Sequence, residues 1–249
     1  MRTRPLVIAH GGNSCEAPQN SLTAFEQALE IGVDAIELDV NRTRDGHPVI
    51  FHGPSLMKTT GQEGSIHDLT LKQARQLDVG SWKDAAFASE RILTLQEALD
   101  FAHGKVRLAV DLKTVDILPT IIQCIQDASM VDEVVICGCS ATWAQRVRAC
   151  DPRLSVGLNM DSSMVALAKE SPLSVFHQAY VREATSRYLS PLNINFRYVT
   201  EDLVRLAHLQ ATQLWAWTVD DPEMMRGLIA VGVDAIYTNF PQALVEVAG

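Results

Sequence analysis

The sequence predicts an α/β fold that closes into a (β/α)8 barrel, and three observations lead to this prediction. Short apolar runs, typical of strands buried on both faces of a parallel sheet, alternate with helical patterns along the chain. Histidines and acidic residues recur where these runs end. The length of 249 residues is common for a single α/β barrel, although it is also compatible with two domains. An open, doubly wound sheet is the competing architecture.

The first predicted strand is the apolar run at residues 6–9, which ends at His10 and two glycines. A helix follows Asn20-Ser21. Thr23 and Glu26 have the spacing of a capping box at its start, and Gly32 is the expected stop.

The second strand, residues 35–40, carries Glu37 and Asp39 on one face and three apolar side chains on the other, because strand side chains alternate. Two carboxylates about 7 Å apart along a strand repel each other unless a positive charge lies between them. A divalent cation is the obvious partner. A solvated face on an edge strand is the alternative.

Residues 47–52 predict another strand, which ends at His52. The pattern then weakens over about residues 54–90, where glycines, polar residues and one short helix near 71–77 indicate an insertion. Thr94 is expected to cap the next helix. We therefore expect one domain over residues 1–249 that carries this insertion.

Strand and helix alternate steadily in the remainder of the chain. The predicted strands are residues 107–111, 133–137, 154–158, 175–179, 193–195, 213–217 and 235–237. The predicted helices are residues 117–128, 141–150, 163–170, 200–209 and 222–231, the last opened by Asp221 with Pro222 in its first turn. The sequence Gly-Val-Asp-Ala-Ile occurs at both 32–36 and 232–236, each time between a helix end and a strand start. This echo supports the α/β prediction.

Composition excludes several classes of function. Hydrophobic residues make up 47% of the chain and charged residues 20%, as in an ordinary globular protein with a large core. The net charge of −9 argues against a general nucleic-acid binder. No signal peptide or membrane span is evident. The five cysteines contain no CxxC pair, which predicts reduced thiols in a cytoplasmic protein, with Cys137 and Cys139 as packing residues rather than zinc ligands. The sequence predicts no particular oligomeric state.

Polar residues gather at the carboxyl ends of the predicted strands, which meet at one face of a parallel barrel. The residues expected there are His10, Glu37, Asp39, His52, Asp111, Lys113 and the pair Trp217-Thr218. His177 lies at another predicted strand end and is the one remaining histidine expected to reach this mouth.

These residue types suit metal-assisted cleavage of a phosphoester. Hard carboxylate oxygens favour Mg²⁺ or Ca²⁺ over zinc. Two histidines free of the metal suit general acid and base catalysis near neutral pH. Lys113 would neutralise phosphate oxygens. Each residue has a simpler alternative, since a histidine at a strand end is often structural and Asp111-Leu112-Lys113 also suits a salt-bridged turn.

The chain resembles the glycerophosphodiester phosphodiesterases over nearly its whole length. The matching segments are His10-Gly11-Gly12, Ala17-Pro18-Gln19-Asn20-Ser21, Ile36-Glu37-Leu38-Asp39-Val40, Thr43-Arg44-Asp45-Gly46, Val49-Ile50-Phe51-His52, Leu77-Asp78-Val79-Gly80, Glu90-Arg91-Ile92-Leu93-Thr94-Leu95, Asp111-Leu112-Lys113, Trp217-Thr218-Val219-Asp220 and Thr238-Asn239-Phe240-Pro241. The resemblance implies a TIM barrel with a small insertion after the second catalytic histidine. It also implies hydrolysis of a small-molecule glycerophosphodiester to glycerol 3-phosphate and an alcohol.

Roles carried over from the resemblance fall on residues already singled out. It implies that His10 and His52 are catalytic and that Glu37, Asp39 and Asp111 bind the metal. Lys113 and Trp217 would contact the substrate.

The sequence departs from the family pattern around this site. Gly11 replaces the usual arginine, Gln19 the usual glutamate, Gly53 the usual aspartate, and Asp111 a more usual glutamate. These departures leave two alternatives to the expected activity. One is an enzyme of the same fold with a shifted substrate, such as a sugar phosphodiester. The other is a ligand-binding or regulatory protein that has lost efficient turnover.

Overall fold

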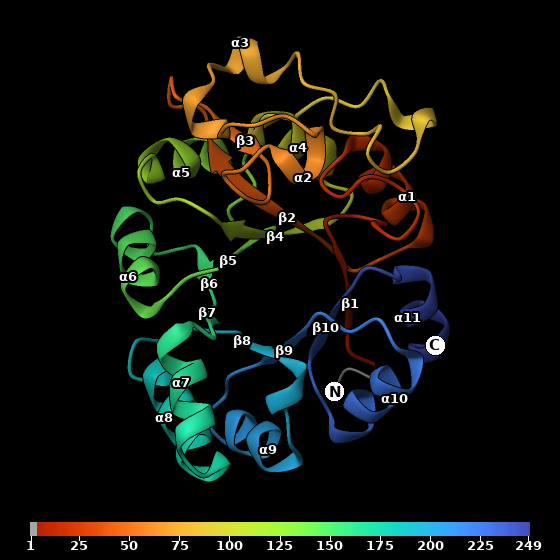
Figure 1. Ribbon diagram of the computed structural model, residues 1–249. Coiled ribbons are helices and arrows are strands. Elements are labelled where there is room, and N and C mark those ends of the chain that lie inside the picture. Colours follow the sequence, from red (N-terminus) through yellow and green to blue (C-terminus); the bar gives the residue numbers. More distant parts are fainter. Residues whose placement is uncertain (1–3) are drawn as a thin grey trace.

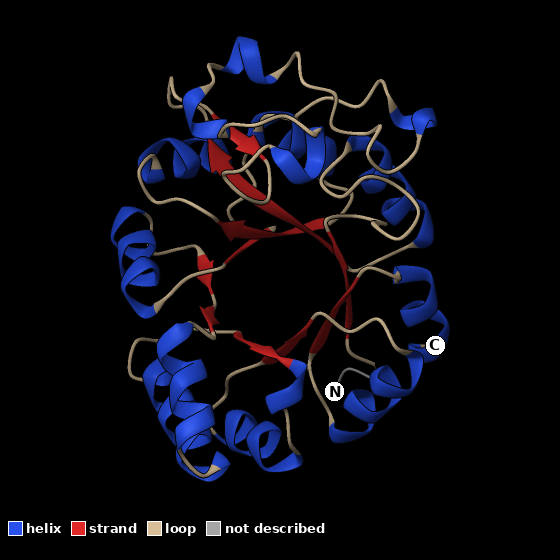
Figure 2. Cartoon of the chain, in the orientation of Figure 1, coloured by secondary structure: helices blue, strands red, loops and turns tan. Residues whose placement is uncertain are grey.

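The computed structural model describes residues 4–249 and has nine parallel strands arranged in a ring. In chain order they are β1 (Leu6–His10), β2 (Ala35–Arg42), β4 (Arg107–Leu112), β5 (Val134–Cys137), β6 (Ser155–Val156), β7 (Leu158–Asn159), β8 (Leu192–Asn195), β9 (Leu214–Trp217) and β10 (Ala235–Thr238). Their order around the ring is β6-β5-β4-β2-β1-β10-β9-β8-β7. Figure 2 shows this ring of strands inside a shell of helices.

Only Gly157 separates β6 from β7, so these two short strands occupy one position of the barrel. The Gly157 amide donates to Ile136 O at 2.9 Å, and the next amide, of Leu158, donates to Pro191 O at 2.9 Å. The chain therefore changes partner from β5 to β8 within one residue. The predicted (β/α)8 barrel is confirmed, and the open sheet is excluded.

The helices pack against the outside of the barrel (Figure 1). They are α1 (Leu22–Ile31), α4 (Leu95–Ala102), α5 (Leu118–Asp127), α6 (Ala141–Cys150), α7 (Ser162–Glu170), α8 (Leu173–Thr185), α9 (Glu201–Leu209), α10 (Pro222–Val231) and α11 (Pro241–Ala248). No helix of residues 4–249 has both the length and the apolar character needed to cross a membrane.

Strand β2 divides its side chains between two cores, as the alternation predicts. Ile36, Leu38 and Val40 lie in the large core between strands and helices. Ala35 belongs instead to the small core inside the barrel, and Glu37 and Asp39 follow it at intervals of two. The two carboxylates therefore point into the barrel.

Most predicted helix ends are confirmed. Gly32 and Gly232 have φ of 82° and 87° and end α1 and α10 in the left-handed conformation that glycine tolerates best. Thr94 forms a full capping box with Glu97. The predicted Thr23–Glu26 box is wrong, because the Ser21 hydroxyl caps α1 by accepting from the amide of Ala24.

The repeated Gly-Val-Asp-Ala-Ile segment holds neighbouring strands together. Asp34 Oδ2 accepts from the amide of Val7, and Asp234 Oδ2 accepts from that of Leu214, both at 2.8 Å. Each aspartate thus ties the start of its own strand to the preceding strand position. The repeat is structural and lies at the amino end of the barrel, away from the mouth.

The predicted strand at residues 175–179 is wrong, because this segment is part of α8. Its buried residues include Phe176, His177, Tyr180, Val181 and Ala184, a spacing that follows the helical period. The short apolar run alone could not distinguish a strand from a buried helix. His177 is accordingly placed on α8, where its ring meets the carbonyl of Tyr198 at 3.3 Å, and it does not line the barrel mouth.

The strand expected at residues 47–52 is shorter than predicted and runs in the other direction. It is β3 (Pro48–Ile50), which pairs antiparallel with the far end of β2. The segment after it contains α2 (Met57–Thr60), α3 (Leu71–Ala74) and two 3-10 turns, Ile66–Asp68 and Ala85–Phe87. It has its own small core, which consists of Val49, Phe51, Leu56, Ile66, Ala74, Leu77, Val79 and Ile92.

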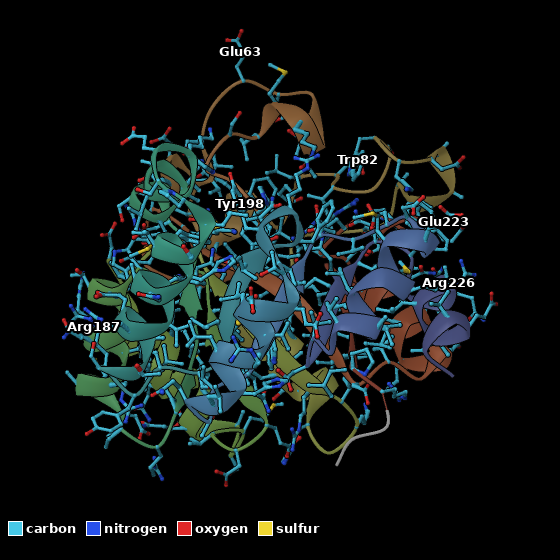
Figure 3. All side chains as sticks on the ribbon, turned by 90° about the horizontal axis from the view of Figure 1, so that it is seen from below. Glu63, Trp82, Arg187, Tyr198, Glu223 and Arg226 are labelled. Carbon is cyan, nitrogen blue, oxygen red and sulfur yellow. The ribbon has the colours of Figure 1, made fainter. Side chains whose placement is uncertain are left out.

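This insertion lies beside the ring of strands, at one edge of the barrel mouth (Figure 1). Figure 3 places Glu63 and Trp82 of the insertion at the same end of the molecule as Tyr198 and Glu223, which follow β8 and β9. That end is where the carboxyl ends of the parallel strands meet. The insertion is thus positioned to shape a site in the mouth.

Candidate active site

Glu37, Asp39 and Asp111 come together on two adjacent strands of the barrel. Asp39 of β2 lies in register with Asp111 of β4, and Glu37 lies in register with His10 of β1. One carboxylate oxygen from each of the three acids lies within 4.8 Å of the others. The strand register therefore assembles the acidic cluster that the sequence predicted.

Backbone and amide groups fix the direction of two of these carboxylates. The Gly11 amide donates to Glu37 Oε2 at 2.9 Å, and Asn20 Nδ2 donates to Asp39 Oδ2 at 2.7 Å. The Asp39 amide in turn donates to Asn20 Oδ1 at 3.2 Å. Asn20 was part of a matched segment, but its role in orienting Asp39 could not be read from the sequence.

Lys113 is the cation inside this cluster. Its Nζ lies 2.9 Å from Asp39 Oδ1 and 3.1 Å from Asp111 Oδ1. Burial lowers the pKa of Lys113, but the two carboxylates outweigh this effect and raise its pKa. The ammonium is therefore positively charged at every physiological pH.

One lysine does not neutralise three carboxylates. Burial, and then repulsion from Asp39 and Asp111, raises the pKa of Glu37 well above its usual range. Burial also raises the pKa of Asp111, with a partial opposing effect from Lys113. The cluster is thus short of positive charge.

The donor set fits a divalent cation. All three side chains offer oxygen ligands, which Mg²⁺ and Ca²⁺ prefer. Asp39 Oδ1 is buried and accepts no hydrogen bond from residues 4–249; Lys113 approaches it at ion-pair distance but outside hydrogen-bond geometry. A buried carboxylate oxygen in this state has an open coordination position.

His10 is oriented by two residues that follow the last two strands, Asp220 after β9 and Asn239 after β10. Its Nδ1 lies 2.7 Å from Asn239 Oδ1, while Asn239 Nδ2 donates to Asp220 Oδ2 at 2.7 Å. A carboxylate can only accept, so Asp220 determines which end of the Asn239 amide faces His10. The amide oxygen then requires the proton of a neutral His10 to be on Nδ1, which leaves Nε2 as the basic nitrogen.

His52 reaches the same site by an unexpected route. The sequence placed it at the end of a parallel strand, but it follows β3, which runs antiparallel to β2. The Phe51 amide donates to the Asp39 carbonyl at 2.9 Å, and this hydrogen bond holds the segment that carries His52 beside the acidic cluster. The predicted location is therefore correct, although the predicted strand is not.

A cavity of about 340 Å³ lies in the barrel mouth and joins these groups. Its lining residues are His10, Glu37, His52, Asp111, Lys113, Asn159, Asn193, Trp217, Thr218 and Tyr237. Of the seven residues to which the resemblance gives a role, six line this one cavity, and the seventh, Asp39, forms an ion pair with Lys113 of the cavity wall.

Three polar atoms in the cavity wall lack a hydrogen-bond partner in the chain from residue 4 onward, and two of them belong to asparagines that the sequence did not single out. Asn159 Oδ1, Asn193 Oδ1 and Trp217 Nε1 are buried and have no hydrogen-bond partner among residues 4–249. Native interiors rarely leave such atoms unsatisfied, so the three are available to a ligand. Asn159 ends β7 and pairs with Asn193, the second residue of β8, and the pairing of β8 with β9 brings both to the same cavity as Trp217.

Gly11, Gln19 and Gly53, the rim positions at which the sequence departs from the family pattern, also lie near this site. Gly11 has φ of 65°, and a Cβ built on it would lie 2.1 Å from Gln19 Cγ. Positions 11 and 19 are therefore in direct contact, and glycine at 11 is suited to the glutamine at 19. Gly53 differs, because a Cβ there meets no atom within 4 Å.

Comparison with known proteins agrees with the fold and identifies the family. Residues 10–243 match the model of the glycerophosphoryl diester phosphodiesterase family. A glycerophosphodiester phosphodiesterase of Caldanaerobacter subterraneus subsp. tengcongensis is 33% identical over 249 residues, which cover 98% of this chain and 97% of the relative.

Solved structures show the same architecture. A glycerophosphodiester phosphodiesterase from Agrobacterium tumefaciens superposes with a TM-score of 0.81 at 21% identity, covering 97% of this chain and 99% of that one. An Oleispira antarctica phosphodiesterase, solved in complex with the product sn-glycerol-3-phosphate, superposes with a TM-score of 0.81 at 25% identity, covering 98% of this chain and 96% of that one. With the family match over nearly its whole length, this chain belongs to the glycerophosphoryl diester phosphodiesterase family and is a phosphodiesterase with a TIM-barrel fold.

Proposed function

We propose that this enzyme hydrolyses glycerophosphodiesters to glycerol 3-phosphate and an alcohol in a metal-dependent reaction that uses His10 and His52 for acid–base catalysis. The observation that carries the proposal is the shared cavity, which places both histidines and Lys113 around the three carboxylates. The family and the product complex of the Oleispira relative support the choice of substrate.

The metal would be held by Glu37, Asp39 and Asp111, with Mg²⁺ or Ca²⁺ as the candidates. When bound, such a cation would supply positive charge that stabilises the phosphate oxygens and the deprotonated attacking group. The insertion, about residues 54–90, would act as part of the same single domain.

The protein groups divide the proton transfers between them. One histidine takes a proton from the attacking oxygen, which forms a new bond to phosphorus. The P–O bond to the leaving alcohol breaks, and its electron pair stays on that oxygen. The other histidine delivers a proton there, so that charge does not accumulate on the alkoxide. Lys113 stabilises the additional negative charge on the phosphoryl oxygens in the transition state.

A release assay on glycerophosphocholine and bis(p-nitrophenyl) phosphate tests the proposal, run with Mg²⁺, with Ca²⁺ and with EDTA. We expect metal-dependent turnover that falls by about 10²–10⁴-fold in His10→Ala and His52→Ala. Absence of turnover above the His10→Ala level on every diester would refute the hydrolase proposal.

The alternative of a shifted substrate, such as a sugar phosphodiester, is tested by changing the rim residues at positions 11 and 19. The informative variant is Gly11→Arg combined with Gln19→Glu, which introduces the residues usual in the family at both positions; side chain 19 must move aside in it, because a Cβ at position 11 would lie 2.1 Å from the Cγ of residue 19. If its preference among glycerol and sugar phosphodiesters equals that of the parent enzyme, the rim does not determine substrate choice.

A further inference from the structure

A second cavity, of about 200 Å³, adjoins the barrel-mouth cavity on the other side of His52. His52 lines both, so the two cavities meet at a residue proposed to be catalytic. The second cavity lies between the barrel and the insertion. Its lining residues are Gln19, Asn20, Ile50, Phe51, His52, Gly53, Pro54, Ser55, Lys58, Thr59, Val79, Trp82 and Ile92.

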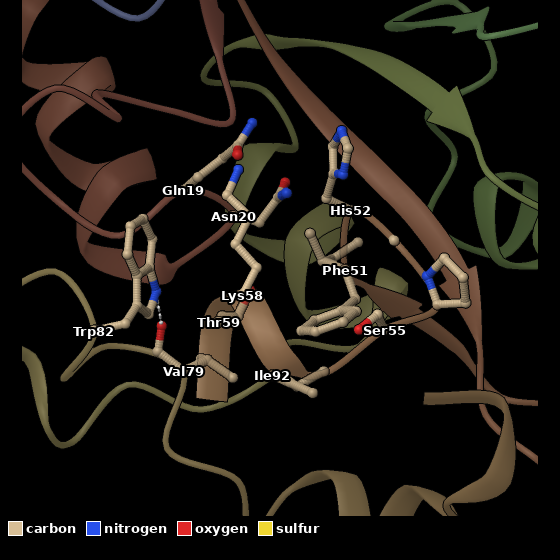
Figure 4. A pocket seen from close by; sticks show the side chains of 13 residues that line it. Gln19, Asn20, Phe51, His52, Ser55, Lys58, Thr59, Val79, Trp82 and Ile92 are labelled. Carbon is tan, nitrogen blue, oxygen red and sulfur yellow. Dashed lines mark hydrogen bonds between the residues drawn. The ribbon is translucent and has the colours of Figure 1, made fainter. Parts of the chain in front are cut away.

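The wall of this second cavity combines polar with apolar side chains, and Lys58 gives it a positive charge. Figure 4 shows Lys58 between Trp82 on one side and His52 on the other, with its side chain directed toward Gln19 and Asn20. No lining residue in the described part of the chain is a carboxylate. The Trp82 indole N–H is already used, since it donates to Val79 O at 2.8 Å. Trp82 therefore offers only its ring.

The barrel-mouth cavity differs in its hydrogen-bonding needs. Its unpartnered atoms are two amide acceptors, on Asn159 and Asn193, and one donor, the N–H of Trp217. A vicinal diol can satisfy all three, because a hydroxyl both donates and accepts. The glycerol end of a glycerophosphodiester fits this side, which leaves the insertion cavity for the group on the other side of phosphorus.

From this geometry we infer that the insertion cavity is the subsite for the leaving alcohol, and that it selects polar alcohols without positive charge over cationic amino alcohols. The inference rests on the proposed function and specifies its substrate class. Lys58 repels a quaternary or primary ammonium, and no nearby carboxylate in the cavity wall offsets that repulsion. A neutral polyol meets no such penalty.

Two different substitutions each make the charge of the insertion cavity more negative. Lys58→Glu reverses the existing charge on an exposed side chain. Gly53→Asp introduces a carboxylate where a Cβ meets no atom within 4 Å. Lys72→Glu is the matched control, since Lys72 is an exposed lysine of the same insertion that lines neither cavity.

The experiment measures kcat/KM for glycerophosphoglycerol and glycerophosphocholine at low ionic strength, with saturating Mg²⁺. We expect the parent enzyme to favour glycerophosphoglycerol. The ratio of the two values should fall by about two- to fivefold in Lys58→Glu and in Gly53→Asp, the size expected for partly screened charges, and should stay unchanged in Lys72→Glu.

The outcomes separate this inference from the function on which it rests. Turnover of both diesters with a ratio that Lys58→Glu and Gly53→Asp alter no more than Lys72→Glu would overturn the leaving-group subsite alone. A parent preference for glycerophosphocholine would also overturn it. No turnover of either diester by the parent enzyme would overturn both proposals.

Discussion

Gly138 lies so close to the Asp111 carboxylate that a Cβ at position 138 would be 2.0 Å from Asp111 Oδ1. Gly138 follows β5, the strand that pairs with β4, and has φ of 70°. The absence of a side chain there gives Asp111 the space in which it points toward Glu37 and Asp39. A glycine outside every predicted functional segment thus helps to form the cluster of three carboxylates.

Gly138→Ala is therefore expected to displace Asp111 and to lower both metal affinity and activity, by about 10–100-fold as for other residues that orient metal ligands. Calorimetric titration with Mg²⁺ and an activity assay check this result. Gly32→Ala is the matched control: Gly32 has φ of 82°, but a Cβ there meets no atom within 4 Å. The control should lose about 1 kcal/mol of stability and keep its metal affinity. Equal metal affinities in the two variants would contradict this role of Gly138.

Metal binding should stabilise the enzyme in a manner that depends on Glu37. A cation at 100 times its Kd adds about 2.7 kcal/mol to the free energy of unfolding. Glu37→Gln removes one of three ligands, so we expect its Tm to respond much less to Mg²⁺ or Ca²⁺ than that of the parent. Thermal melts with the cation and with EDTA make the comparison. An equal shift in both proteins would show that Glu37 does not bind the ion.

The same residue predicts a pH dependence for the metal-free protein. Burial and the neighbouring carboxylates raise the pKa of Glu37 above the 4.5 of an ordinary glutamate, so between these values the folded state holds a proton that the unfolded state has lost. The free energy of unfolding in EDTA should therefore fall as the pH rises through that interval. Metal affinity should rise over the same interval, because binding expels the proton. Denaturant unfolding of the parent and Glu37→Gln at several pH values tests the sign: the decrease should be smaller in Glu37→Gln.

Asp220 is expected to act on catalysis through Asn239. In Asp220→Asn, the new side chain has an NH2 group to offer, so the Asn239 amide loses the constraint that directs its oxygen to His10 Nδ1. We predict a fall in kcat of about tenfold, less than the 10²–10⁴-fold contribution of a general acid or base because His10 itself is kept, and a shifted pH profile. Nitrogen chemical shifts of His10 should show mixed tautomers, with metal affinity unchanged.

Asp221→Asn is the control for that variant, because it makes the same chemical change one residue along the chain. Asp221 caps α10 by accepting from the amides of Glu223 and Met224, and asparagine is an equally good capping residue. Its pH profile should match that of the parent. If both variants behave alike, the orientation of His10 does not depend on Asp220.

His177 should contribute to acid sensitivity rather than to catalysis. Burial lowers the pKa of His177 below the usual 6.5, with a partial opposing effect from the Tyr198 carbonyl. The stability that its neutral ring contributes is thus present above about pH 6.5 and is lost as the pH falls through the lowered pKa. His177→Gln keeps a donor but does not titrate. We expect its free energy of unfolding to decrease less than that of the parent between pH 8 and pH 5. Parallel decreases would contradict this assignment.

By itself, the sequence determined the alternation of strand and helix, the direction of Glu37 and Asp39 on one strand face, and most helix ends. These features depend on local periodicity and on single capping residues, which a linear pattern contains. The strand predictions that were wrong, at residues 47–52 and 175–179, concerned short apolar runs. Such runs suit a parallel strand, an antiparallel strand and a buried helix equally well, and only long-range packing selects among them.

The tertiary structure decided what surrounds the predicted site residues. Strand register pairs Asp39 with Asp111 and leaves Lys113 between them. The pairing of β7, β8 and β9 brings Asn159 and Asn193 to the same cavity as Trp217, and the antiparallel hairpin carries His52 to the boundary between two cavities. These contacts join residues far apart in the chain, and their energies depend on distance, burial and direction. None of these quantities is encoded in the spacing of residues along the sequence.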